Sequence, residues 1–311
     1  MANTIDTTGL IAYSGQYEKL LIRTMLAGLT AANDLTLDQN IKGKKNLTKL
    51  TTASIMKPYS STFSATDSSI GYSGRSLQTE IGKGELLIDV MEYRNTWLEQ
   101  QMAPGVPKAD LNAIPFAADT WNQVMQKAAD DLNLNTVWNG VHNAAGTQAK
   151  DIADGLHTII KRAITTEGLV ANVTGAITTA TAVDQVEFMY KRHAAKYREM
   201  PMQMFVSYDT FDKYTENYRE RFGRNMDYAG FTAQPIAQSN GKCFLKPVLW
   251  MGNSSRIVCT PKANLMMGTD RMSDLNQVRA IADVWTIRAG IALALGFQIR
   301  DLEVIQVNDQ L

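Results

Sequence analysis

The sequence has few of the residues that build catalytic or metal centres. Among its 311 residues are two cysteines, Cys243 and Cys259, which could form one bridge at most and exclude a disulfide framework or a cysteine-rich metal site. The three histidines, His142, His157 and His193, lack the paired spacing that places two imidazoles on one helix face for zinc. We therefore expect reduced, packed thiols, histidines that are exposed or hydrogen-bonded, and no bound metal or other cofactor.

The chain also lacks the short motifs of nucleotide-binding and nucleophilic enzymes. The nearest approach to a phosphate loop is IGKGE, where Gly82 and Gly84 are not followed by the Lys-Ser/Thr pair or third glycine that such a loop needs. SIMK, from Ser54 to Lys57, matches a Ser-x-x-Lys nucleophile pattern, but its companion motifs are missing. No residue qualifies as catalytic, so the sequence predicts a protein that is not an enzyme.

Neither sign of charge is in excess, and no long apolar run occurs. The 31 basic and 31 acidic residues balance, which gives no argument for a dedicated nucleic-acid binder or a membrane-surface protein. No stretch approaches the ~18 apolar residues of a membrane span, and the N-terminal residues lack the features of a secretory signal. We expect an intracellular, soluble protein with no membrane partner.

One local concentration of charge departs from this balance. Lys42, Lys44, Lys45 and Lys49 lie within eight residues of the stretch IKGKKNLTKL. Two interpretations stay open: a charged stretch that only faces water, or an arm that contacts a polyanion or an acidic patch of another subunit.

The apolar content is high enough for a sizeable core and follows recognisable periods. Apolar residues make up 45% of the chain. Spacings of three and four predict helices at 16–33, 121–132, 152–163, 183–197 and 208–222. Short apolar runs predict strands at 202–207 and 302–307 and in the stretch that begins at Val278. This mixture predicts an α+β protein, as one elaborated domain or two connected lobes.

A long polar excursion interrupts the first third of the chain. Its middle, Ser60 to Gly74, is rich in Ser, Thr and Gly and too poor in apolar residues to bury itself, whereas the run from Leu86 to Tyr93 resembles a strand. This pattern predicts a two-stranded hairpin that leaves the body and returns. Since an isolated hairpin is barely stable in water, we expect 60–82 to need another surface on which to lie and to contribute little to its own core.

The order of these parts carries a resemblance to a known family. The segment TPKANLMMGTD, Thr260 to Asp270, follows the polar loop and apolar runs of FTAQPIAQSNGKCFLKPVLWMGNSSRIVC and precedes a polar linker, further strands and a short final strand. Together with the N-terminal arm, the Ser/Gly-rich excursion and the long helix, it resembles the major capsid protein of tailed bacteriophages, the Hong Kong 97-type shell fold. In that family such a segment closes the axial lobe before the chain returns to the peripheral one.

The resemblance implies an α+β Hong Kong 97-type capsid fold with an N-arm, an extended β-hairpin loop, a peripheral domain with a long spine helix, and an axial domain. The implied ranges are 1–49 for the arm, 50–101 for the extended loop, 102–149 and 274–297 for the peripheral domain with its spine helix at 115–135, and 150–270 and 302–307 for the axial domain.

The resemblance also implies a function. The chain would assemble in the host cytoplasm, as pentamers and hexamers, into the icosahedral shell of a virion that encloses the phage genome. The implied partners are copies of the same chain, a portal, and packaged double-stranded DNA held without sequence specificity. Some family members carry a long extra N-terminal segment as a built-in scaffold, and none precedes the arm in this sequence, so the resemblance implies a separate scaffolding protein, or none.

Two alternatives remain open. An encapsulin-type compartment shell resembles the same fold but would enclose cargo enzymes in place of DNA; the long Ser/Gly-rich loop and the chain length favour the phage shell. A soluble α+β enzyme with an unrecognised site belongs to another class, and a pocket where acid and base side chains converge would reveal it.

Overall fold

The computed structural model of the chain describes residues 13–52, 56–62, 70–89, 116–222, 234–236, 239–270, 277–283 and 286–310. Its helices are α2 (Glu18–Gly28), α3 (Thr30–Asp34), α5 (Phe116–Asp131), α6 (Leu156–Thr166), α7 (Ala182–Lys191), α8 (Ala195–Arg198) and α9 (Tyr208–Phe222). Its strands are β1 (Thr36–Asp38), β2 (Lys44–Thr52), β3 (Ile70–Gln78), β4 (Glu80–Asp89), β5 (Met202–Val206), β6 (Gln234–Pro235), β7 (Cys243–Pro247), β8 (Val258–Thr260), β9 (Leu265–Thr269), β10 (Gln277–Ala282), β11 (Thr286–Ile299) and β12 (Gln306–Val307).

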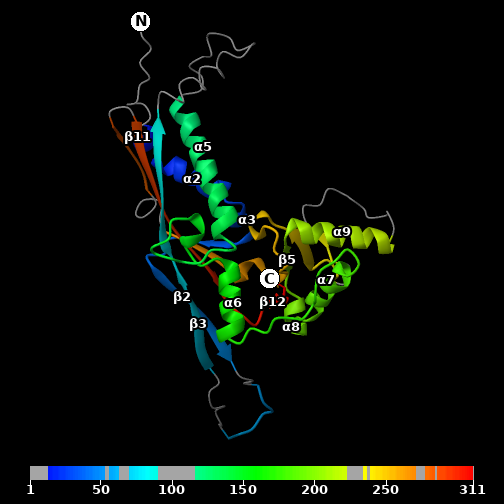
Figure 1. Cartoon of the computed structure of the whole chain (residues 1–311). Coiled ribbons are helices and arrows are strands. Elements are labelled where there is room, and N and C mark those ends of the chain that lie inside the picture. The colour runs from blue at the N-terminus through cyan, green and yellow to red at the C-terminus, as the bar shows by residue number, and fades with distance from the viewer. Residues whose placement is uncertain are drawn as a thin grey trace.

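The larger sheet is organised around β11. This strand pairs antiparallel with β4, β9 and β10, and β1 adds to β9 in parallel. Helices α2 and α5 pack against each other, and the apolar stripe of α5 buries Trp121, Met125 and Ala129 in the main core. Figure 1 shows this sheet as a long blade with α5 lying along it. The helix predicted at 121–132 is confirmed as part of α5.

The smaller sheet forms the centre of a second lobe. Its order is β12-β8-β5-β7-β6, so the buried strand β5 lies in the middle, parallel to β7 and antiparallel to β8. Helices α7 and α9 pack on it through apolar residues that include Val186, Met189 and Tyr214. The strand predicted at 202–207 and the helix predicted at 208–222 are confirmed as β5 and α9. In Figure 1 this lobe lies beside the blade.

A two-stranded ribbon extends from the blade. Strands β2 and β3 pair antiparallel from Lys44 opposite Gln78 to Thr52 opposite Ile70, and β3 is separated from β4 by Thr79 alone. The base of the ribbon is buried, since Leu47 and Leu77 pack in a small apolar cluster. The expectation that 60–82 contributes little to the core is therefore wrong at its C-terminal end, because Leu77 is 0% exposed.

Four predicted elements have different bounds from those expected, and the first is the helix at 16–33, which is divided at Leu29 into α2 and α3. The helix at 183–197 is broken into α7 and α8, and His193 is buried at the break. The strand at 302–307 is confined to β12. The helix at 152–163 begins later, at Leu156, because Gly155 approaches the carbonyl oxygens of Thr136 and Trp138 so closely that a Cβ would lie 2.6 Å or less from them. Tertiary contacts, and not the spacing of apolar residues along the chain, determine these changed bounds.

Candidate assembly surfaces

The four lysines of the N-terminal stretch lie at and along the base of the ribbon. Lys42 precedes β2, and Lys44, Lys45 and Lys49 belong to it. Lys42, Lys44 and Lys45 are exposed, and Lys49 is half-buried. The structure thus keeps the four together, although their predicted contact with a polyanion or another subunit stays a prediction.

Lys45 and Lys49 form ion pairs within their own chain. The ammonium of Lys45 lies 2.5 Å from Asp38, and that of Lys49 lies 2.8 Å from Asp301 and 3.0 Å from Glu303. Burial lowers the pKa of Lys49, but the hydrogen bonds to the two carboxylates outweigh it and leave its pKa raised. The same hydrogen bond from Lys49 is the main cause of a lowered pKa at Glu303. Lys49 therefore ties the ribbon to the segment after β11.

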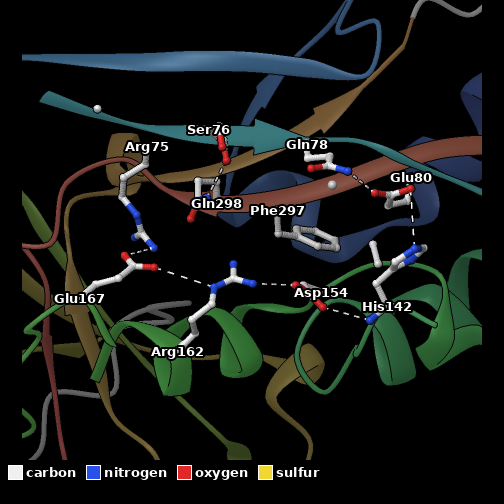
Figure 2. Close-up of a pocket in the computed structure, with 13 residues that line it drawn as sticks. Arg75, Ser76, Gln78, Glu80, His142, Asp154, Arg162, Glu167, Phe297 and Gln298 are labelled. Atoms are coloured by element: carbon white, nitrogen blue, oxygen red, sulfur yellow. Dashed lines mark hydrogen bonds and ion pairs between the residues drawn. The ribbon is translucent and has the colours of Figure 1, made fainter. Parts of the chain in front are cut away.

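A polar cleft of about 660 Å³ lies between the ribbon base and α6. Figure 2 shows its side chains reaching toward one another from two sides. Arg75, Gln78 and Glu80 project from β3 and β4; Asp154, Arg162 and Glu167 project from α6 and the residues flanking it, with His142 beside them. Acidic and basic groups do converge here, as the enzyme alternative requires.

The charged groups of this cleft are paired with each other. The guanidinium of Arg75 lies 2.6 Å from Glu167 and donates to the carbonyl of Ile299 at 3.1 Å. Arg162 lies 2.9 Å from Asp154, which also accepts the backbone N–H of His142 at 3.0 Å. Burial lowers the pKa of Arg75, against the opposing effect of Glu167. This mutual pairing is typical of a structural ion-pair network, which also perturbs pKa values, and not of an acid and base held apart for catalysis.

The outer face of the ribbon presents apolar side chains to water. Leu50 is 56% exposed and its cross-strand partner Tyr72 is 78% exposed. Farther along the same excursion Met56 and Tyr59 are 88% and 96% exposed. Four large apolar side chains on one thin projection favour contact with another surface, because water-exposed apolar groups of this size gain free energy when they are covered.

The turn at 261–264, whose role the sequence left unassigned, is structural. The side-chain amide of Asn264 donates to Thr260 Oγ1 at 2.9 Å and to the carbonyl of Asp301 at 2.9 Å, and its Oδ1 accepts the backbone N–H of Asp301 at 2.7 Å. Asn264 therefore fixes the turn that follows β11, and through Asp301 it positions the partner of Lys49. Sequence reasoning missed this, since the two segments lie far apart along the chain.

The remaining candidate groups do not assemble into a site. Cys243 and Cys259 are buried free thiols with their Sγ atoms 3.9 Å apart, which confirms the expectation of reduced, packed cysteines. Within the described ranges no three His, Cys, Asp or Glu side chains gather as metal ligands. His142 is exposed, and its Nδ1 lies 2.8 Å from the carbonyl of Ile152, as expected.

The expectation of an exposed or hydrogen-bonded histidine is wrong for His193, because it is buried and neither ring nitrogen has a hydrogen-bond partner among the described residues. This histidine is 1% exposed and lies near Cys259 in the core of the second lobe. Burial, aided by the positive charge of Arg198, lowers its pKa to about 4. The imidazole is therefore neutral at physiological pH and acts as a packed core residue.

No family profile and no curated protein matches the sequence, but solved structures match its fold. A chain of the satellite phage P4 procapsid has a TM-score of 0.62 at 14% identity, over 94% of this chain and 90% of that one. The capsid of the native GTA particle gives 0.55 at 12% identity, over 90% and 89%. A virus-like particle from Pyrococcus furiosus gives 0.50 at 9% identity, over 96% and 99%.

These likenesses extend over nearly the whole chain and define its structural class. At these identities the likeness shows a shared fold, and the matched structures are a procapsid and a capsid. The chain has the Hong Kong 97-type fold, as the order of its sequence segments predicted. Among the described helices, none is long and apolar enough to cross a membrane.

Proposed function

We propose that this chain is a major capsid protein that self-assembles into the icosahedral shell enclosing a phage genome. The observation that carries the proposal is the likeness of fold to the P4 procapsid chain across 94% of the sequence. The exposed apolar outer face of the ribbon, with Leu50 and Tyr72 at its centre, supports it independently. A projection of this kind is unfavourable on a monomer and becomes buried when subunits overlap.

The proposal includes a division of the chain into parts. We assign 1–49 to the N-terminal arm, 50–101 to the extended loop, 102–149 and 274–297 to the peripheral domain, and 150–270 and 302–307 to the axial domain. The apolar cluster of the second lobe, formed by residues between Ile177 and Cys259, supports the axial assignment. Strand β2 begins before residue 50, and β4 pairs with β11, so the extended loop shares its strands with the arm and the main sheet.

The proposed partners follow from the same function. Copies of the chain would form pentamers and hexamers, with a portal and a separate scaffolding protein as further partners in the virion. Packaged double-stranded DNA would be held without sequence specificity. Lys42 and Lys44, exposed at the base of the ribbon, are the proposed contacts to a polyanion or to an acidic patch of a neighbouring subunit.

Electron microscopy of the purified chain tests the main proposal. We expect closed shells, or capsomers of five and six subunits, and a mass that corresponds to such assemblies. A stable monomer at high concentration and at every salt concentration tried would contradict it.

An encapsulin-type compartment is the second candidate function. The likeness to the virus-like particle from Pyrococcus furiosus, at a TM-score of 0.50 over 96% of the chain, is the observation that favours it. The contents of particles isolated from the native source separate the two candidates. Double-stranded DNA within nuclease-resistant particles supports the capsid, whereas an enclosed enzyme without DNA supports the compartment.

A further inference from the structure

The two faces of the ribbon differ in their contacts: one contacts the body and the other is exposed. Paired residues of antiparallel strands share a face, so Leu47 and Arg75 point to the same side, together with Lys49 and Ser73 one pair farther out. Leu47 is buried against the body, whereas the outward pair Leu50 and Tyr72 is exposed. The face toward the body therefore runs from an apolar anchor at the base to charged side chains farther out.

Beyond the apolar anchor, ion pairs connect this face to the body. Arg75 reaches Glu167 at the end of α6 at 2.6 Å, with side chains only 14% and 32% exposed. Lys49 reaches Asp301 and Glu303 at 2.8 and 3.0 Å. The acidic partners come from two separate segments, so ion pairs connect the ribbon both to the end of α6 and to the turn after β11.

Two clefts adjoin the Arg75–Glu167 pair, although most of the surface of both side chains is buried. The cleft of about 660 Å³ lies on one side of the Arg75–Glu167 pair, and a second cleft of about 750 Å³, which includes Lys49, lies on the other. Both clefts are lined by Arg75 and Glu167, so this ion pair separates them. At its base the ribbon is held by the packed Leu47 and Leu77 and by the hydrogen bond from Gln298 Nε2 to the carbonyl of Ser76, at 2.7 Å. The two ion pairs, which line the clefts, add further connections to the body.

The first cleft does not offer unpaired charge to a ligand. Each of its charged side chains already has a partner in the cleft wall: Arg75 with Glu167, Arg162 with Asp154, and Glu80 with Gln78 at 2.6 Å and with His142 at 3.8 Å. The network is complete within itself. Its geometry therefore points to a mechanical role in the chain and not to recognition of a small molecule.

We propose that two ionic struts, Arg75–Glu167 and Lys49–Asp301/Glu303, set the direction of the β2–β3 ribbon relative to the body, so that this direction responds to ionic strength. The pair of Lys49 with Glu303, whose side chain is 57% exposed, is open to screening by salt, whereas the partly buried Arg75–Glu167 pair is screened less. The ribbon amplifies a small change, because nine residues of strand span about 30 Å and a tilt of roughly 10° moves the tip by about 5 Å. The inference stands whether or not the chain forms a shell.

Distance measurements between paired spin labels test the proposal on the full chain. One label replaces Met56, which is 88% exposed on the ribbon excursion, and the other replaces Lys161, which is exposed on α6. The native cysteines are buried, so labelling is selective. Dilution of labelled protein with excess unlabelled protein removes distances between neighbouring subunits in any assembly.

The test compares strut variants with a matched control. We expect a narrow distance distribution at low salt, and a distribution shifted or broadened by several ångströms in Glu167→Gln and in Lys49→Gln. At about 1 M salt, where the Debye length is about 3 Å, the distribution of the unsubstituted chain should shift toward that of Lys49→Gln, whose ion pair is the more exposed of the two. Glu85→Gln is the control, because it removes an equal charge from an exposed ion pair with Lys83 that lies within β4.

Substitutions at Arg75 give a second comparison. Arg75→Lys, which keeps a positive charge beside Glu167, should retain a narrower distribution than Arg75→Gln. Superimposable distributions for the unsubstituted chain and for Glu167→Gln combined with Lys49→Gln, at both low and high salt, would overturn the proposal. If the combined variant fails to fold, as judged by circular dichroism, the salt titration of the unsubstituted chain still decides: an unchanged distribution overturns the proposal.

Discussion

Asn264 is a residue whose importance lies in one buried side-chain amide. It makes three hydrogen bonds, to Thr260 Oγ1 and to the backbone N–H and carbonyl of Asp301, and is 6% exposed. An alanine in its place leaves these groups buried without partners, and each such group costs about 1–3 kcal/mol.

Asn264→Ala should therefore lower the free energy of unfolding by about 2–4 kcal/mol. Urea unfolding followed by circular dichroism measures this value. Lys262→Ala, an exposed residue of the same turn, should change it by less than about 0.5 kcal/mol. Equal midpoints for the two variants would show that the turn does not depend on the amide.

His193 links stability to pH. Its folded-state pKa of about 4 lies below the ~6.5 of an exposed histidine. Between these values the unfolded chain binds more protons than the folded one. The stability contribution of the neutral imidazole is thus fully present above about pH 6.5 and is lost as pH falls through about 4.

His193→Leu should reduce the loss of stability between pH 7 and pH 4 by on the order of 2–3 kcal/mol. Urea unfolding at the two pH values measures the loss. His142→Gln, which changes an exposed histidine, should leave the loss close to that of the unsubstituted chain. A His193→Leu chain with the same pH dependence as the unsubstituted one would refute a neutral buried imidazole.

The limits of sequence reasoning are also visible at single residues. The four lysines could be named from the sequence, but the partners of Lys45 and Lys49 could not, because Asp301 lies 252 residues from Lys49. Folding decides which lysine faces a carboxylate and which faces water. The sequence therefore could not distinguish Lys44, which is exposed, from Lys49, which is tied to the body.

At the scale of elements, the spacing of apolar residues was sufficient to predict a helix or strand when those residues line one face of that element. The helices α5 and α9 and the strand β5 were predicted because their apolar residues repeat within the element. The pairing of β4 with β11 was not predicted, because strand pairing is set by contacts about 200 residues apart. The break between α7 and α8 was missed for a similar reason, since tertiary packing buries His193 there.

The ribbon makes an element-scale prediction about assembly. Replacing 51–71 by an Asn-Gly turn joins Leu50 to Tyr72, which lie opposite each other, and keeps the buried Leu47 and Leu77. We expect unchanged circular dichroism and melting of the isolated subunit, with absent or fragile particles under the electron microscope.

A second variant separates the apolar face from the length of the ribbon. Leu50→Ser combined with Tyr72→Ser keeps both strands and should weaken particles in the same direction. Normal particles from the shortened chain would refute an intersubunit role for the ribbon. An unfolded shortened chain would show that the removed segment belongs to the core of its own subunit.

At the scale of the whole molecule, the balanced charge predicts weak DNA binding without sequence preference. Each lysine that contacts a phosphate contributes about −0.9 to the slope of log affinity against log salt concentration. Lys44→Gln should therefore make the slope less steep by about 0.9, for any duplex sequence.

Filter binding or fluorescence anisotropy over a range of salt concentrations measures this slope. Lys45→Gln is the matched control, because its ammonium is already paired with Asp38, and it should change the slope less. Tight binding to one short duplex at physiological salt would contradict the absence of sequence specificity.

The near-continuity of β3 and β4 has a consequence for how the molecule carries force. Only Thr79 separates the ribbon strand from a strand of the main sheet, and β4 is paired with β11 along all ten of its residues. A pull on the ribbon along its axis is therefore transmitted lengthwise into β4. In that direction the backbone hydrogen bonds between β4 and β11 are sheared together and are not peeled apart one after another. Tension applied at the ribbon is thus shared across the central sheet of the blade and does not concentrate at the base of the projection.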